Sequence, residues 1–170
     1  LMWFCTFDGL NRFDGYGFKV YKSGFNSNYA LKNNRVDRIT EDGLGYLWMM
    51  NNDGEVHRMN THTEEFISFN EISSGGSENY SPVTQIFHFG DGETWMSTEA
   101  GSCIRVISYP SSPDYKLDRF AFSSDSSSAG MVNFIYRDSL KSVWILAGSG
   151  LFRMQDDKEQ PEKVSSDYQG

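Results

Sequence analysis

The sequence predicts an all-β protein, a partial β-propeller of about four blades that are each a four-stranded antiparallel sheet. Tryptophan recurs at intervals of 45, 47 and 49 residues, at Trp3, Trp48, Trp95 and Trp144. A glycine follows each tryptophan by six residues, and a valine and an isoleucine precede each of the last three by twelve and nine residues. No stretch has apolar residues at helical spacing. Repeats of this length without helices are typical of propeller blades.

Each unit, V-x2-I-x8-W-x5-G, divides into four short strands with Gly- and Asp-containing turns between them. In the second unit we expect strands at Val36–Thr40, Leu47–Met50, Val56–Met59 and Phe66–Phe69. The counterparts expected in other units are Thr94–Ser97, Val143–Leu146, Cys103–Ile107, Leu151–Met154, Phe18–Tyr21 and Phe120–Phe122. The predicted domain covers residues 1–170, with blades at about 1–22, 35–69, 82–122 and 131–165. The first blade lacks its innermost strand, because no Val/Ile strand precedes Trp3.

The repeated residues suggest how the blades pack. Val36 and Ile39 are three residues apart, which places them on opposite faces of a regular strand. A sheet between two neighbouring blades is packed on both faces, so this spacing is compatible with a blade. We expect the tryptophans to fill the wedges between blades rather than to bind a ligand.

The segments between blades, 23–34, 70–82 and 123–130, are rich in Ser, Gly and Asn, which is typical of surface loops. They should emerge at the same end as the turns before each repeat glycine. A ligand site built there would use aromatic rings for the apolar surface of a ligand, and amides, carboxylates or guanidinium groups for its polar groups. The candidate ligand-binding residues are Tyr29, Arg35, Asn52, Asp53, Tyr80 and Glu99.

Composition excludes several classes of partner. The net charge is −8, since the chain has 23 acidic residues and only 15 basic ones, which are scattered. Direct binding to nucleic acid or an anionic membrane is therefore not expected. No run of 18 apolar residues provides a membrane segment in this piece. Cys5 and Cys103 fit no CxxC pattern. They are predicted to be small buried hydrophobes, and a disulfide is less favoured because they lie two blades apart.

Few residues suggest chemistry. No metalloprotease, nucleophile-elbow or P-loop motif occurs. His57, His62 and His88 are spread over different strands and turns, so no metal or other cofactor is expected; His57 and its neighbour Arg58 sit in a third strand, where polar side chains can face solvent. Asp8, Asp53 and Glu99 occupy equivalent turns or nearly so. Turn formation is the favoured interpretation, and ligand contact or a catalytic carboxylate pair remains open.

Two stretches resemble a known family. The run from Trp3 to Gly15 continuing into Phe18–Tyr21, and the run from Val36 to Asp42 continuing into Gly45–Trp48, are similar to the two-component regulator propeller repeat. The third and fourth units keep only the skeleton. The family's Gly-Thr after the tryptophan strand becomes Cys5-Thr6, Met50-Asn51, Ser97-Thr98 and Leu146-Ala147, and its Leu after the repeat glycine becomes Glu55 and Ser102.

This resemblance implies the periplasmic sensor region of a hybrid two-component histidine kinase. Such a region has two consecutive propellers and a β-sandwich, followed by a membrane span, a kinase and a response regulator with a DNA-binding end. The implied signal is an oligosaccharide released from polysaccharides. The matching residues are structural in the family, so no binding residue carries over.

We therefore expect a non-catalytic sensor segment, excised from a longer periplasmic region of an inner-membrane protein. Its expected partners are an oligosaccharide, the remaining blades of the parent and, for this piece alone, a second copy of itself. The alternatives are a polysaccharide lyase or glycosidase on a propeller scaffold, or a purely structural interaction module.

Overall fold

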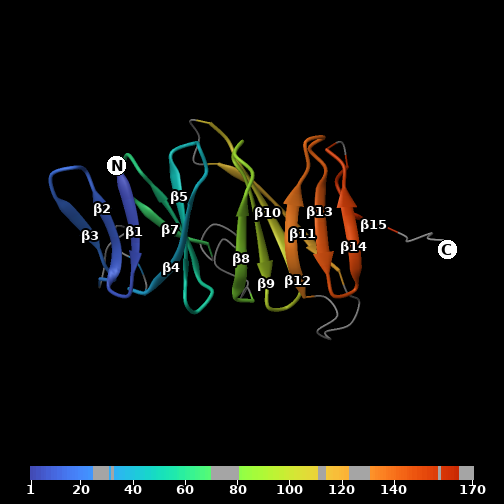
Figure 1. Cartoon of the computed structure of the whole chain (residues 1–170), viewed down its shortest axis with the longest axis horizontal. Coiled ribbons are helices and arrows are strands. Elements are labelled where there is room, and N and C mark those ends of the chain that lie inside the picture. The colour runs from blue at the N-terminus through green and yellow to red at the C-terminus, as the bar shows by residue number, and fades with distance from the viewer. Residues whose placement is uncertain are drawn as a thin grey trace.

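Four antiparallel sheets follow one another along the long axis of the molecule in the computed structural model (Figure 1). The structure describes residues 1–24, 31, 33–69, 81–110, 114–122, 131–156 and 158–164. The first sheet has three strands and each of the other three has four, and within every sheet the strands are neighbours in chain order. We call these sheets blades 1 to 4. The predicted all-β partial propeller, with an incomplete first blade, is confirmed.

The strands alternate in direction within each blade. Blade 1 contains β1 (Met2–Thr6), β2 (Gly9–Phe13) and β3 (Phe18–Tyr21). Blade 2 contains β4 (Val36–Glu41), β5 (Tyr46–Asn51), β6 (Val56–Asn60) and β7 (Phe66–Ser68). Blade 3 contains β8 (Val83–His88), β9 (Glu93–Thr98), β10 (Ser102–Ser108) and β11 (Tyr115–Ala121). Blade 4 contains β12 (Val132–Arg137), β13 (Val143–Ala147), β14 (Gly150–Met154) and β15 (Glu162–Lys163).

One strand begins well before its predicted start. The aromatic run predicted a strand from Phe120, whereas β11 begins at Tyr115 and pairs with β10 from Ser108↔Tyr115 to Ser102↔Ala121. The charged residues in between hid this strand, but Arg105 on β10 holds Asp118 directly opposite, with Nη2 donating to Oδ2 at 2.6 Å. The polar half of β11 is thus stabilised across the ladder.

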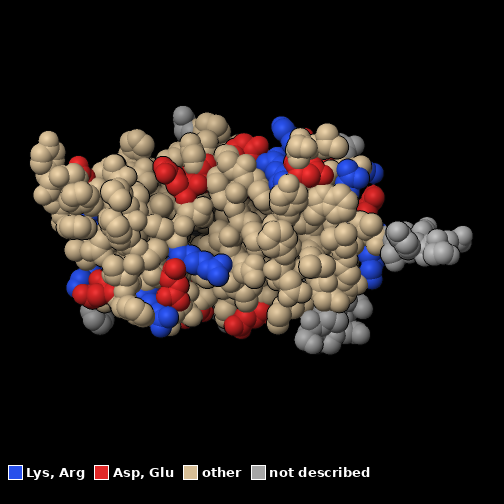
Figure 2. All heavy atoms as spheres, in the orientation of Figure 1, with Lys and Arg blue, Asp and Glu red and all other residues tan. Residues whose placement is uncertain are grey.

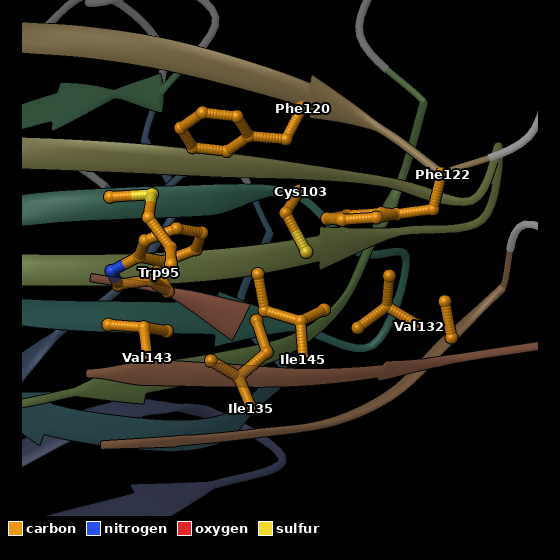
Figure 3. Close-up of a cluster of buried hydrophobic side chains, with 10 residues drawn as sticks. Trp95, Cys103, Phe120, Phe122, Val132, Ile135, Val143 and Ile145 are labelled. Atoms are coloured by element: carbon orange, nitrogen blue, oxygen red, sulfur yellow. The ribbon is translucent and has the colours of Figure 1, made fainter. Parts of the chain in front are cut away.

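The hydrophobic core is divided among the contacts between neighbouring blades. Figure 3 shows the cluster between blades 3 and 4, which contains Trp95 and Phe120 of blade 3 and Ile135 and Ile145 of blade 4. The Trp95 and Phe120 rings stack with centroids 5.2 Å apart. Similar clusters join blade 1 to blade 2 and blade 2 to blade 3. Each sheet is therefore stabilised chiefly by the neighbours it buries.

The predicted packing of the tryptophans is confirmed where both neighbouring blades are present. Trp48 and Trp95 are fully buried, each between its own blade and the next. Trp3 is partly buried against the core between blades 1 and 2. Trp144 points to the outer face of the last blade and is only partly buried.

The prediction that the repeated valine and isoleucine face opposite sides is wrong. The pairing of β4 with β5 shifts register between Val36 and Arg38, which marks a β-bulge. The extra residue turns Val36 and Ile39 to the same side, and both pack in the cluster between blades 1 and 2. The first strands of blades 3 and 4 have equivalent register shifts. The spacing of three is therefore the signature of a bulge.

A tryptophan and an arginine lie directly opposite each other on the second and third strands of every blade. The pairs are Trp3↔Arg12, Trp48↔Arg58, Trp95↔Arg105 and Trp144↔Arg153. In each pair the guanidinium carbon is 5.1 to 5.9 Å from the indole ring centroid. We call the side that carries this pair the tryptophan face and the other side the opposite face. In blades 1 to 3 the tryptophan face meets the following blade.

Two further expectations concern β6. His57 and Arg58 were expected where side chains can face solvent, but each is only 1% exposed. Blade 2 has a neighbour on both sides, so the polar side chains of its third strand are covered as well.

Cys103 is buried as expected and Cys5 is half-buried, and both thiols are free.

No helix within the described ranges has the length and apolar character needed to cross a membrane.

Candidate functional site

The described candidate residues lie at one end of the blades: Asn52, Asp53 and Glu99 in turns that follow tryptophan strands, and Arg35 just before β4. These turns run along the lower edge of the molecule in Figure 1. Gly54 in the blade 2 turn has a φ of +77°, a backbone conformation that glycine adopts without strain. Its carbonyl accepts a hydrogen bond from the Val83 N–H at 2.9 Å. The turn of blade 2 is thus held against the beginning of blade 3.

Asn52 and Asp53 form a polar cluster with a residue that the sequence did not single out. The Nδ2 of Asn33 donates to Asn52 Oδ1 and to Asp53 Oδ2, both at 3.1 Å. Asp53 Oδ1 accepts the Glu55 N–H at 3.1 Å, which stabilises the turn. All three side chains of the cluster are polar, and two of them are uncharged amides.

Arg35 is positioned by the first two blades. Its guanidinium carbon lies 4.9 Å from the ring centroid of Phe7, and its Nε donates to Asp37 Oδ1 at 2.9 Å. Phe7 is 80% exposed in the blade 1 turn. This pair therefore presents an accessible aromatic ring beside a cation at the same end as the Asn33 cluster.

A cleft of about 270 Å³ lies between the blade 2 turn and the start of blade 3. Its lining residues are Asp53, Gly54, Glu55, Val56, Phe69, Ser81, Pro82 and Val83. Among the described candidates, Asp53 lines this cleft. Glu99 lies in the next turn along, exposed, and its N–H donates to the Pro82 carbonyl at 2.9 Å.

Asn52 and Asp53 share one turn and are bridged by Asn33, Arg35 lies just before β4, and Glu99 lies in the corresponding turn of blade 3. Tyr29 and Tyr80 lie outside the described residues. Sequence reasoning missed Phe7, Asn33 and Ser81. Phe7 could have been found from the repeat, because it precedes Asp8-Gly9 as Asn52 precedes Asp53-Gly54.

Two carboxylates at this end, those of Asp8 and Asp53, have side-chain partners. Asp8 pairs with Lys22, and Asp53 accepts hydrogen bonds from Asn33 and from its own turn. The Asp53 bond to the Glu55 N–H belongs to the turn itself, whereas the Asp8 carboxylate pairs with a lysine just after β3. Across the described ranges no group of three His, Cys, Asp or Glu side chains could hold a metal ion. On the face in Figure 2, basic and acidic side chains are interspersed without a basic patch.

Three comparisons with known proteins bear on this chain. No protein-family model matches it, and no curated protein matches it. Solved structures are similar over almost the whole chain. The extracellular domain of BT4673 from B. thetaiotaomicron, assigned as a hybrid two-component system, is 25% identical with a TM-score of 0.62, over 98% of this chain and 24% of that domain.

Two other solved structures share the fold. The extracellular domain of BT3049, assigned to the same class in the same organism, is 20% identical with a TM-score of 0.63, over 94% of this chain and 21% of that one. PorZ, a surface component of the type-IX secretion system of Porphyromonas gingivalis, is 16% identical with a TM-score of 0.63, over 95% of this chain and 25% of that one. This chain thus spans about a quarter of the length of each.

Proposed function

We propose that this chain is a non-catalytic sensor segment of an extracytoplasmic region that belongs to a hybrid two-component system. The observation that carries the proposal is the likeness to the extracellular domain of BT4673, at 25% identity over 98% of this chain. The family resemblance of the first two repeats supports the same class. The kinase, the membrane span and the remaining blades belong to the proposed parent protein.

The proposed ligand is a neutral oligosaccharide bound at the turn end of blades 1 to 3. Amide and carboxylate groups of Asn33, Asn52 and Asp53 supply hydrogen-bond partners for hydroxyls, and the exposed Phe7 ring supplies an apolar surface. A ligand without charge is not repelled by a chain whose net charge is −8. A sensor also requires that the ligand bind two arrangements of the protein with different affinity.

Isothermal titration calorimetry with a panel of neutral oligosaccharides tests the ligand site. For an oligosaccharide of the panel that binds, Asp53→Ala and Phe7→Ala should each weaken the binding by about 10-fold, roughly 1.4 kcal/mol. Glu41→Ala is the matched control, because Glu41 is exposed at the other end of blade 2 and its loss changes the charge equally.

Two outcomes would count against the proposal. Release of shortened sugars during incubation would indicate an enzyme. Binding that is unaffected by Asp53→Ala and Phe7→Ala would place the ligand elsewhere.

A further inference from the structure

The two outermost sheet faces of the chain are apolar and exposed. On blade 1 this is the opposite face, and on blade 4 it is the tryptophan face. Their exposed apolar residues are Met2, Phe4, Phe18 and Val20 on blade 1, and Tyr136, Leu146 and Leu151 on blade 4. Burial of such surfaces is favourable, so each is a candidate contact.

The tryptophan face of blade 4 has the same layout as the tryptophan faces that are covered inside the chain. Leu146 pairs with Leu151 in blade 4 as Met50 pairs with Val56 in blade 2. Met50 and Val56 are 8% and 1% exposed under blade 3, whereas Leu146 and Leu151 are 46% and 38% exposed. Blade 4 thus carries one half of an interface that this chain builds three times.

The opposite face of blade 1 carries the other half. Phe13 pairs with Phe18 in blade 1 as Met59 pairs with Phe66 in blade 2. Met59 and Phe66 are buried against blade 1, while Phe18 is 66% exposed. Phe18 also contacts Phe4 and Phe13, with ring centroids 6.2 and 4.8 Å apart, so the aromatic side chains form one continuous surface.

The arginine of each covered tryptophan face reaches the next blade. Arg12 donates to Glu64 at 2.7 Å, Arg58 to Ser108 at 3.4 Å, and Arg105 contacts the Met154 sulfur at 4.0 Å. Arg153 has the same place on blade 4. In blade 1 the β2–β3 turn contains the acidic residue Asp14, as the β6–β7 turn of blade 2 contains Glu64.

We propose that, for this chain on its own, the tryptophan face of blade 4 in one copy binds the opposite face of blade 1 in a second copy, which takes the place that a flanking blade would have in the proposed parent. The contact is head to tail and continues the stacking between blades across the boundary between copies. Such a heterologous contact closes a ring if its rotation permits, and otherwise extends into longer assemblies.

Sedimentation equilibrium on two charge-insertion variants tests this contact. Phe18→Glu blocks the blade 1 face and Leu146→Glu blocks the blade 4 face. The unmodified chain should exceed the 19.4 kDa of a monomer as concentration rises. Each variant alone should remain monomeric, because every possible contact then includes a blocked face. An equimolar mixture should form a complex of one copy of each, since the intact face of one fits the intact face of the other.

Leu140→Glu is the control. Leu140 is 76% exposed in the β12–β13 turn, so this substitution adds the same charge outside both faces. It should associate like the unmodified chain. If circular dichroism shows that Phe18→Glu is unfolded, Met2→Glu replaces it. If Leu146→Glu is unfolded, Leu151→Glu replaces it. A monomeric unmodified chain at all concentrations overturns the proposal. Continued self-association of either single variant does so as well, since it would indicate a contact between like faces or at another surface.

Discussion

Arg58 lies over the indole of Trp48, its neighbour across the β5–β6 ladder, with 5.7 Å between the guanidinium carbon and the ring centroid. It also lies 4.3 Å from the Tyr46 ring and 5.6 Å from the Tyr115 ring of blade 3. Burial lowers the pKa of Arg58 from its ordinary value, while nearby Tyr46 and Asp42 favour the charged form. A buried cation therefore joins two blades through three aromatic rings.

Replacing this arginine should destabilise the protein strongly. Arg58→Ala removes the cation–π contacts and the packed alkyl chain, and we expect a loss of about 3 kcal/mol in the free energy of unfolding. Arg38→Ala is the control, because Arg38 is exposed on β4 of the same blade, and should change stability by no more than about 0.5 kcal/mol. Urea unfolding measures both, and equal losses would contradict a structural role for Arg58.

The turn glycine of blade 2 should tolerate no side chain. A Cβ on Gly54 would lie 2.7 Å from Pro82 Cβ and 2.8 Å from the Val83 carbonyl oxygen, and its φ is +77°. Gly54→Ala should cost about 3 kcal/mol from backbone strain and overlap together. Gly15, at φ +99°, has nothing within 4 Å of such a Cβ. Gly15→Ala therefore introduces backbone strain without overlap, and we expect it to lower the free energy of unfolding by about 1 kcal/mol. Thermal unfolding of both variants compares them, and a Gly54 variant no less stable than the Gly15 variant would refute the close approach.

The contact between blades 1 and 2 should weaken in acid. Glu64 accepts hydrogen bonds from Lys19, from Tyr21 at 2.9 Å and from Arg12 at 2.7 Å. The Lys19 hydrogen bond is the main cause that lowers the pKa of Glu64 below its ordinary 4.5, and Tyr21 and the charge of Arg12 add to it against the opposing effect of burial. The unfolded chain therefore binds the proton more readily than the folded one. The stabilisation is fully present above about pH 4.5 and is lost as the pH falls through the folded pKa.

Glu64→Gln tests this pH dependence. The variant should lose about 1 kcal/mol at pH 7, and the difference from the unmodified protein should shrink below pH 4. Denaturant midpoints from pH 3 to 7 measure it. A difference that stays constant over this range would mean that ionisation of Glu64 contributes nothing.

The two thiols should differ in reactivity. Cys103 is fully buried, and burial raises its pKa to about 12. Burial and, to a smaller extent, the charge of Asp37 raise the pKa of the half-buried Cys5 as well. Because alkylation requires an accessible thiolate, Cys103 should react roughly 100-fold more slowly than Cys5 in the folded protein. Peptide mass spectrometry after timed alkylation measures the two rates, which should become similar in denaturant. Equal rates in the folded state would place Cys103 at the surface.

Much of the fold could be predicted because its signal is the repeat itself. The indole and the turn glycine recur in register, and strand positions follow from them. The bulge in each first strand was missed, because the spacing from Val36 to Ile39 was interpreted on a regular strand. The arginine partners recur nine or ten residues after each tryptophan, so the sequence did contain a signal for them.

The candidate site was less predictable from sequence. Asn33 and Asp53 are twenty residues apart in the chain and meet only because the segment entering blade 2 passes the turn of that blade. No repeat position identifies such a contact, since connections between blades vary in length and composition. Phe7 was overlooked because its repeat equivalents, Asn52 and Glu99, are polar.

Nuclear Overhauser effects between the Trp95 indole and methyl groups test the stacking of blades most directly. Trp95 should show strong effects to Ile135 and Val143, which lie on the following blade, 40 and 48 residues further along the chain. If Trp95 contacts only methyl groups of its own sheet, the blades do not stack through their tryptophan faces.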